Sequence, residues 1–401
     1  MKNFLFNSKE VLGRSRYPWV DYARGICIIL VCFRHVFEGL SNSGFDVESN
    51  SLLKYFNIFF FSFRMPLFFI VSGIFFMASM KRKGFSEYVK TRFSTILYPL
   101  MIWGFLQITL QLIFADYVNA DRHPIDYLHL ITDPRRIEQF WYLNALFFVG
   151  LLYALLKVYG NFKPWHQVIT GIVLFVIAEI AFFNKVNIGF LFDLCFFYIF
   201  FAIGDLIGDL ILNTRNYKAL TSRWLFLIIV PVFAVLQHYF TKINLKAGDD
   251  YYVQYHLPLL YLLCALIGGA FVLNISFILQ KMDVVPFLRV IGFHSLYIYV
   301  MHLMVTSFTR IAMTRFLNID NVPLLLISGI VMGIVIPMII YNFAVRYGGG
   351  WLFHLRKGIA SKMGDPSIYY HTGMVTPRES VSFKENPDSK TNQLKDNNNE
   401  N

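Results

Sequence analysis

Long apolar stretches of roughly 18 to 25 residues recur along the chain from about residue 25 to residue 344. A helix of ~20 apolar residues crosses a hydrocarbon layer of ~30 Å, so each stretch predicts a membrane-spanning helix. The polar connections are short, which leaves no room for a separate soluble domain. The predicted fold is therefore all-α, a polytopic integral membrane protein of about ten helices. We expect them at residues 25–40, 55–79, 93–114, 139–157, 167–183, 189–212, 224–240, 256–279, 292–309 and 323–344.

The composition agrees with this pattern. Of the 401 residues, 56% are hydrophobic and 15% are charged, whereas about a quarter of a soluble globular protein is charged. Residues 1–360 are predicted to form one transmembrane domain, and the polar residues 361–401, which lack an apolar period, a disordered cytoplasmic tail. The four cysteines lie inside apolar stretches, so neither a disulfide framework nor a metal site is predicted.

The net charge of +11 is unevenly distributed over the predicted topology. With a cytoplasmic N-terminus, the inner segments hold 25 Lys and Arg residues and the outer loops hold 8. This asymmetry follows the positive-inside rule and predicts that both termini are cytoplasmic. Because topology accounts for the positive charge, no nucleic-acid partner is predicted. The first apolar stretch is interpreted as an uncleaved helix, since no small-residue cleavage site follows it.

The first predicted span carries polar residues on one face. Asp21, Arg24, His35 and Glu38 recur at helical spacing. Arg24 and His35 are separated by ~16 Å along a helix axis, which places Arg24 at the cytoplasmic surface and His35 near mid-membrane. A simple alternative is an anchoring arginine and a core histidine. Glu38, one turn beyond His35, could orient the imidazole and keep it basic, which favours a function.

The second predicted span enters from the outside and contains Arg64 at a depth similar to that of His35. A charged group near the bilayer centre costs at least ~2.5 kcal/mol, so Arg64 needs a partner or a role. Pro66 is expected to kink or unwind this helix where the backbone lines a cavity. The alternative is that Arg64 only pairs with Glu38 to hold the two helices together.

A cytoplasmic loop between spans two and three is strongly basic. It contains Lys81, Arg82, Lys83, Lys90 and Arg92. Positive-inside topology alone explains such a cluster. The same side chains are natural partners of phosphate groups, so the loop is also a candidate site for a polyanionic ligand.

Two further segments carry candidate chemistry. In the ninth span Ser295, Tyr299 and His302 share a helix face, which core hydrogen bonding explains as well as catalysis does. Trp141 and Tyr142 begin the fourth span at the outer interface. An aromatic belt is the default explanation for this pair, and stacking on a sugar is the alternative.

In this order, these segments resemble the membrane-bound acyltransferase-3 family, and the opening segment is most similar to its fucose 4-O-acetylase-like branch. The resemblance covers roughly residues 15–345. Arg34 departs from the family pattern, which has an uncharged residue there; it points about 100° away from the His35 face and is expected to pair with another helix. The matching residues are Asp21, Arg24 and His35; Arg64-Met65-Pro66-Leu67-Phe68-Phe69 with Ser72 and Gly73; Trp141-Tyr142-Leu143; Phe201 and Gly204; and Gly292, Ser295-Leu296-Tyr297-Ile298-Tyr299 and His302.

The resemblance implies transfer of an acyl group, usually acetyl from cytoplasmic acetyl-CoA, to a hydroxyl of a glycan or lipid-linked sugar outside the inner membrane. Membrane lipids and glycan-assembly proteins are the other expected partners. Arg24 and the basic loop would hold the phosphates of acetyl-CoA, whose extended arm is of the order of the ~16 Å to His35. His35 would act as general base or carry the acyl group, and Arg64 would stabilise the oxyanion. The expected supporting residues are Asp21, Ser72, Tyr299 and His302.

Two alternatives from other classes stay open at this point. A transporter or flippase of lipid-linked sugars or acyl groups would also place His, Glu and Arg inside the membrane. Such carriers often contain internal repeats, and none is evident here. The second alternative is a non-catalytic partner in a membrane assembly.

Overall fold

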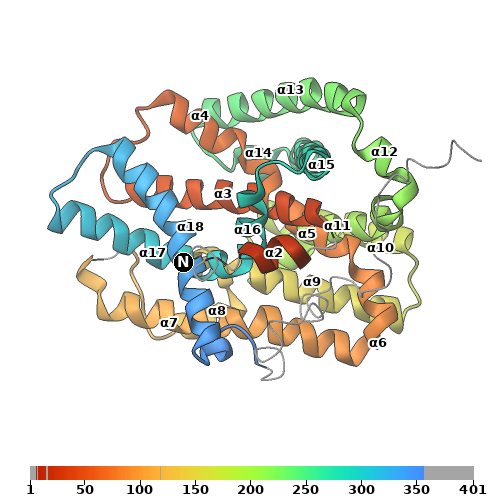
Figure 1. Ribbon diagram of the computed structural model, residues 1–401, viewed down its shortest axis with the longest axis horizontal. Helices are drawn as coiled ribbons and strands as arrows, with labels where there is room; N and C mark the ends of the chain where they lie inside the picture. Colours follow the sequence, from red (N-terminus) through yellow and green to blue (C-terminus); the bar gives the residue numbers. More distant parts are fainter. Residues whose placement is uncertain (1–5, 7, 15–16, 118, 356–401) are drawn as a thin grey trace, which may run out of the picture.

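The computed structural model describes residues 6, 8–14, 17–117 and 119–355, and every regular element among them is helical (Figure 1). The tail predicted at 361–401 lies outside the described residues. In chain order the elements are α2 (Ser8–Arg14), α3 (Pro18–Ser41), α4 (Ser51–Phe59), α5 (Phe61–Ile74), α6 (Phe76–Arg92), η1 (Phe93–Leu97), α7 (Tyr98–Ile113), η2 (Ala115–Tyr117), α8 (Asp126–Thr132), η3 (Pro134–Phe140), α9 (Trp141–Val158), α10 (Pro164–Phe183), α11 (Phe190–Leu212), η4 (Thr214–Asn216), α12 (Tyr217–Leu220), α13 (Arg223–Ala247), α14 (Tyr252–His256), α15 (Pro258–Met282), α16 (Pro286–Phe293), α17 (Ser295–Ile311), η5 (Ala312–Phe316), α18 (Val322–Arg346) and η6 (Gly349–Leu352).

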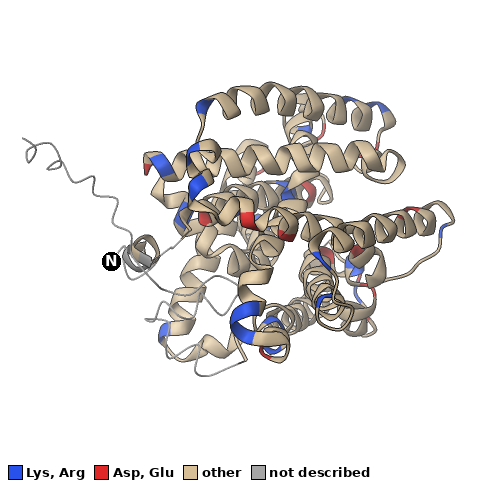
Figure 2. Ribbon diagram, turned by 90° about the vertical axis from the view of Figure 1, so that its right-hand side faces the viewer, with Lys and Arg blue, Asp and Glu red and all other residues tan. Residues whose placement is uncertain are grey.

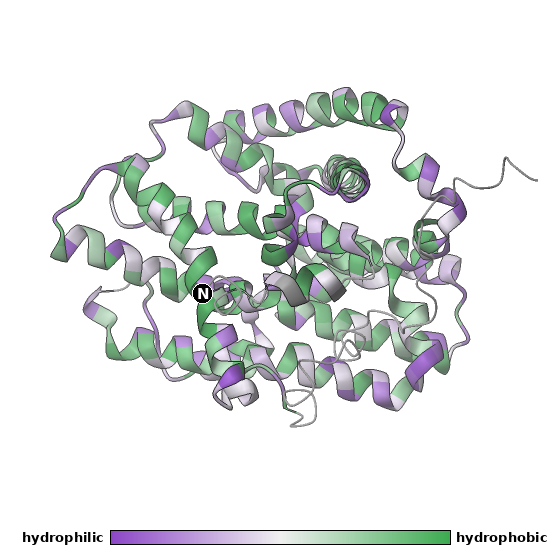
Figure 3. Ribbon diagram, in the orientation of Figure 1, coloured by the Kyte–Doolittle hydropathy of each residue, from purple (hydrophilic) through white to green (hydrophobic). Residues whose placement is uncertain are grey.

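Nine helical segments of the described residues are long and apolar enough to cross a membrane. Figure 3 shows them as long hydrophobic helices with hydrophilic residues gathered toward their ends and connections. Each corresponds to one of the last nine predicted spans, so the chain is a multi-pass membrane protein. The segments are α4 with α5, α6 with η1 and α7, η3 with α9, α10, α11, α13, α15, α17 with η5, and α18.

The remaining predicted span is α3, which begins earlier than expected, at Pro18. It is not among the nine because every 18-residue stretch of it holds at least three of the charged residues Asp21, Arg24, Arg34 and Glu38. It runs through the middle of the molecule (Figure 1) and packs against α5, α15, α16, α17 and α18. These helices shield its charged groups from lipid, which is how a polar helix is accommodated in a membrane bundle.

Most Lys, Arg, Asp and Glu positions lie at helix ends and in connections, with a smaller set inside the bundle (Figure 2). The basic segment predicted to be a loop is instead helical, and it forms most of α6. Lys and Arg are good helix formers, so charge alone does not end a helix. The helix is broken within this segment at Gly84, whose φ of 69° favours glycine.

The second predicted span is interrupted elsewhere than expected. Pro66 lies inside α5, and the break between α4 and α5 falls earlier, at Phe60. A second break separates α5 from α6 at Phe75. The ninth span is also divided, because α16 ends at Phe293 and α17 begins at Ser295. The longest of the predicted outer loops, from about 116 to 138, contains the short helix α8.

Glycines bring α5 and α11 into close contact. A Cβ atom on Gly204 would overlap the main-chain oxygen of Ile70, and one on Gly73 would overlap that of Phe201. Helices in membranes often pack through such small residues, because the hydrophobic effect does not drive helices together in lipid and close van der Waals contact is needed instead. The α5–α11 contact holds Arg64, on α5, in a fixed position within the bundle.

Close contacts at glycines also join α3 to α16. A Cβ atom on Gly292 would overlap the main-chain oxygen of Asp21, and one on Gly25 would overlap that of Leu288. These contacts fix the half of α3 that carries Arg24.

Replacing Gly204 by Ala is expected to destabilise the protein. The new methyl group meets a main-chain atom that cannot rotate away, so α5 and α11 must separate, at a cost of about 1–3 kcal/mol. Thermal unfolding of the purified protein in detergent measures the effect. Gly269→Ala is the matched control, because its Cβ would lie 3.4 Å from the side-chain tip of Ile70. Equal melting temperatures for the two variants would contradict the tight α5–α11 contact.

Candidate active site

A cavity of about 640 Å³ lies at the C-terminal end of α3, and we call it the large cavity. α3 contributes His35 and Glu38, α7 contributes Gln107, and the start of α9 contributes Trp141. A small cavity of about 90 Å³ is lined by some of the same residues and adds Arg64 from α5 and Tyr299 from α17. Residues shared by the two cavities are His35, Glu38, Arg135, Trp141 and Tyr251. The two cavities therefore meet at His35.

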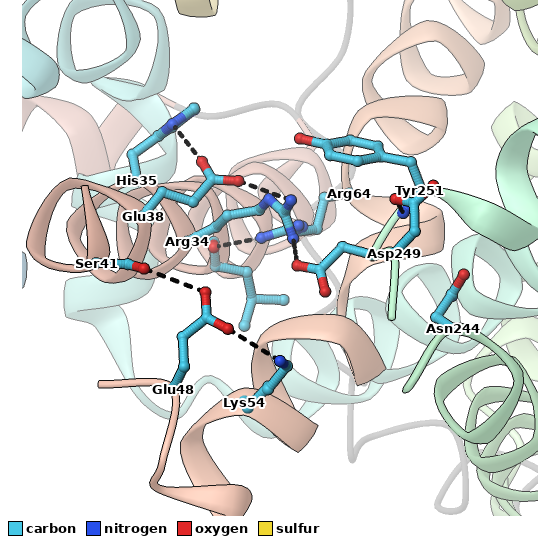
Figure 4. Close-up of polar contacts among 12 residues, drawn as sticks. Arg34, His35, Glu38, Ser41, Glu48, Lys54, Arg64, Asn244, Asp249 and Tyr251 are labelled. Carbon is cyan, nitrogen blue, oxygen red and sulfur yellow. Dashed lines mark hydrogen bonds and ion pairs between the residues drawn. The ribbon is translucent and has the colours of Figure 1, made fainter. Parts of the chain in front are cut away.

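His35 faces the cavities with about a quarter of its side chain exposed, 24%. Its Nδ1 lies 3.4 Å from Oε2 of Glu38, one turn along the same helix (Figure 4). Its Nε2 has no hydrogen-bond partner among the described residues. A carboxylate on one ring nitrogen fixes the imidazole and leaves the other nitrogen available to exchange a proton.

Glu38 is bound more tightly by Arg34 than by His35. Its Oε1 lies 2.6 Å from Nη2 of Arg34 (Figure 4). The other terminal nitrogen of Arg34, Nη1, lies 3.2 Å from Oδ2 of Asp250. Arg64 forms no ion pair with Glu38 among the described residues, and the two groups are only within electrostatic range of each other. Arg34 does pair outside α3, but with the turn before α14 rather than with a helix. Burial raises the pKa of Asp250, and Arg34 opposes that shift.

Arg64 is buried, with 3% of its surface exposed. It donates a hydrogen bond of 2.9 Å to the main-chain oxygen of Leu30, and its guanidinium lies over the ring of Phe61, 5.4 Å from the centroid. That one bond uses one of its five N–H donors. The group lines the small cavity together with His35, so the sequence prediction that they face one cavity agrees with the structure.

α17 places His302 and Tyr299 beside His35. The rings of His302 and His35 are 5.1 Å apart. His302 donates from Nδ1 to the main-chain oxygen of Tyr299 at 2.8 Å, and its buried Nε2 has no partner among the described residues. The hydroxyl of Tyr299 donates to the main-chain oxygen of Gln139. Ser295, on the same face, is buried but lines neither cavity.

Arg24 lies toward the other end of α3, within electrostatic range of Asp21 and of Arg92 at the end of α6. Tyr142 interacts with both arginines, and its ring is 5.1 Å from that of Tyr299. Tyr142 thus lies within electrostatic range of the two arginines and in ring contact with Tyr299, which lines the small cavity.

The other predicted donor-binding residues are placed as follows. Lys81 and Lys90 are exposed on α6, and Lys83 donates to the hydroxyl of Thr91 at 3.3 Å. Arg82 is half-buried, whereas Arg92 is buried. Of the basic segment, only Arg92 is buried, and it is the member within electrostatic range of Arg24.

Among the supporting residues, Asp21 is buried near Arg24, and Ser72 is buried in α5 and lines neither cavity. No group of three or more His, Cys, Asp or Glu side chains within the described part of the chain is arranged to hold a metal ion.

Sequence reasoning missed several polar residues of the large cavity. Arg135 forms an ion pair of 2.6 Å with Asp193, and Arg122 one of 3.0 Å with Glu138. Gln107 donates to Glu138 at 2.8 Å. Asp193 in α11 and Gln107 in α7 are polar residues within otherwise mostly apolar helices, and that was the available signal.

The helix α3 lies in the middle of a bundle of membrane-spanning helices and carries ionisable residues, and the large cavity reaches its His35. These features are those of an integral membrane protein with a polar site inside the bundle. The chain belongs to the acyltransferase-3 family, because that family's model, described as an acyltransferase domain, matches residues 17–342. The family resemblance seen in the sequence is thereby confirmed.

A curated relative is nodulation protein NolL of Mesorhizobium japonicum. It is 26% identical over 218 residues, which cover 54% of this chain and 54% of that protein. The match thus spans about half the length of each chain. No solved structure matches this chain significantly.

Proposed function

We propose that this protein is an inner-membrane O-acyltransferase that moves acetyl from cytoplasmic acetyl-CoA to a hydroxyl of an extracytoplasmic or lipid-linked glycan. The observation that carries the proposal is the position of His35. It lies where the two cavities meet. Tyr299, which lines the small cavity, is in ring contact with Tyr142, and Tyr142 lies within electrostatic range of Arg24 and Arg92. On this proposal the acceptor reaches the imidazole through the large cavity and the donor reaches it from the Arg24 end of α3.

The chemistry follows from this placement. Nε2 of His35 accepts the proton of the acceptor hydroxyl while the hydroxyl oxygen attacks the thioester carbonyl. Arg64, with N–H donors left over in the small cavity, stabilises the oxyanion of the tetrahedral intermediate. The carbon–sulfur bond then breaks, and the imidazolium returns its proton to the leaving thiolate. The products are the acetyl ester and CoA.

The acceptor side of the proposal rests on the lining of the large cavity. The lining includes the amides of Gln107, Gln111, Asn42 and Asn119 and the ring of Trp141. Gln107, Gln111 and Asn119 already form hydrogen bonds within the protein, and Arg135 lies over the Trp141 ring, so a sugar would share or replace these contacts. This combination suits a sugar, so Trp141 is proposed to stack on the acceptor rather than to serve only as a belt residue. With both termini cytoplasmic, this end of α3 faces outward.

Replacing Arg24 by Gln is expected to weaken acetyl-CoA binding by about tenfold or more. A charge-assisted hydrogen bond to phosphate contributes at least ~1.5 kcal/mol, and tenfold corresponds to about 1.4 kcal/mol. Equilibrium binding of acetyl-CoA to the detergent-solubilised protein measures the effect. Lys281→Gln is the control, because Lys281 is exposed at the C-terminal end of α15 and lies outside this cluster. Unchanged affinity in Arg24→Gln would remove Arg24 from the donor site.

The whole proposal is tested by mass analysis of surface glycans from cells with and without the gene. An acetyl-sized mass that disappears with the gene, together with acetyl-CoA binding by the pure protein, is the expected result. Transport of a lipid-linked sugar without acetyl-CoA binding would instead assign the chain to the carriers. A co-purifying complex with neither property would assign it a role in assembly.

A further inference from the structure

Two arginines lie where the large cavity is lined by the end of α17 and by η5. Arg310 and Arg315 both line it, and neither forms an ion pair with any residue that the structure describes. Arg315 lies over the ring of Tyr117, 5.0 Å from its centroid. Arg310 is half-buried and Arg315 is exposed. The two charges repel each other, so an anion between them would be favoured.

The other charges that line the large cavity are already matched. Glu38 pairs with Arg34, and Arg135 pairs with Asp193. Glu138 pairs with Arg122 at 3.0 Å. The excess positive charge is therefore confined to Arg310 and Arg315.

The same part of the large cavity carries exposed aromatic rings. Phe114, Phe308 and Phe316 are 42%, 52% and 80% exposed, and all three line the large cavity. Exposed apolar side chains of a membrane protein face hydrocarbon, whereas the arginines beside them require an anion or water. An amphipathic lipid with a phosphate group satisfies both requirements.

The spacing along α17 leaves room for a saccharide. Arg310 is eight residues from His302, which corresponds to roughly 12 Å along the helix. His302 contacts His35, and His35, Gln107 and Trp141 all line the large cavity. A sugar carried on the phosphate would therefore extend toward the imidazole.

We propose that the acceptor is a lipid-linked saccharide phosphate whose phosphate binds Arg310 and Arg315 and whose hydrocarbon chain lies against Phe308 and Phe316. This inference rests on the proposed acyl transfer and specifies its acceptor. The phosphate is preferred to a sugar carboxylate because the arginines stand beside exposed aromatic rings rather than beside His35.

The test is equilibrium binding to the full-length protein in discs of neutral lipid, so that no anionic lipid competes. The probes are a long-chain polyprenyl phosphate, the neutral polyprenol of the same length, and glucose 1-phosphate. We expect the lipid phosphate to bind at least about tenfold more tightly than the polyprenol, and Arg310→Gln or Arg315→Gln to lose about tenfold in affinity. Lys242→Gln, which removes an exposed charge on α13 outside the cavity, is the control and should bind as the wild type does.

The outcomes separate this inference from the proposed function. Wild-type affinity for the lipid phosphate in both arginine variants, with acetyl-CoA binding intact, overturns the inference alone. Equally tight binding of glucose 1-phosphate overturns the role of the hydrocarbon chain and leaves a free phosphate as the ligand. Arginine-dependent binding without any acetyl transfer overturns the proposed function and supports the anion site. Melting temperatures of all variants are compared, and a fall confined to the arginine variants would assign them a structural role and overturn the inference.

Discussion

Replacing His35 by Gln is expected to lower the rate of acetyl transfer by about 10² to 10⁴-fold, the range of general acid–base catalysis. Gln keeps a hydrogen-bonding side chain of similar length but cannot take up a proton at neutral pH. Because Glu38 pairs mainly with Arg34, the carboxylate keeps its partner when the imidazole is removed. The fold and acetyl-CoA affinity should therefore change little. Transfer from labelled acetyl-CoA to the acceptor, measured with the pure protein, checks the rate.

His238→Gln is the matched control for that experiment. His238 also lies in an apolar helix, α13, and its Nδ1 contacts the hydroxyl of Tyr55 at 2.8 Å, away from both cavities. Its replacement should leave the rate unaltered. If His35→Gln kept full activity, the mechanism proposed here would be wrong.

The same variant separates the two mechanisms that the sequence leaves open. A covalent mechanism forms an N-acetyl imidazole on His35 and releases CoA before the acceptor binds. Incubation with labelled acetyl-CoA without acceptor would then label the wild type and not His35→Gln. Direct transfer gives no label in either protein. The ring of His302 contacts His35 and would be the next candidate if the label survived in His35→Gln.

Much of the fold could be predicted because a membrane constrains the length and polarity of each helix. Apolar length located all ten spans, although the first of them, α3, begins earlier than expected, at Pro18. The breaks at Phe60 and His294 could not be predicted in the same way. Neither residue is a helix breaker by type, and tertiary contacts of the neighbouring helices decide where such breaks fall.

The candidate site was predictable where it depends on one helix and not where it depends on several. The spacing of His35 and Glu38 determines their contact, whatever else surrounds them. The pairing of Arg34 with Asp250 joins positions 216 residues apart, which no local pattern reveals. Tyr142 was visible as an aromatic residue, but its position between Arg24 and Tyr299 follows only from the packing of α9 in the bundle.

Replacing Arg64 by Gln is expected to lower kcat by about 10² to 10³-fold, as removal of an oxyanion donor does in other enzymes. The guanidinium lies buried at the small cavity and donates to Leu30, which fixes it without using all of its donors. Because this stabilisation applies to charge that develops in the transition state, the KM for acetyl-CoA should stay nearly constant. Arg64→Lys keeps the charge but not the planar set of donors, and it should recover part of kcat.

A purely structural role for Arg64 predicts a different result. The bond to Leu30 joins α5 to α3, so its loss alone would lower the melting temperature and affect kcat and KM together. Arg289→Gln calibrates that effect, because Arg289 is also buried, donates to the main-chain oxygen of Leu12 at 3.2 Å and lines neither cavity. A fall in kcat far beyond that of Arg289→Gln, at a similar melting temperature, supports the oxyanion role. Parallel losses of stability and activity in the two variants would leave Arg64 as a link between helices.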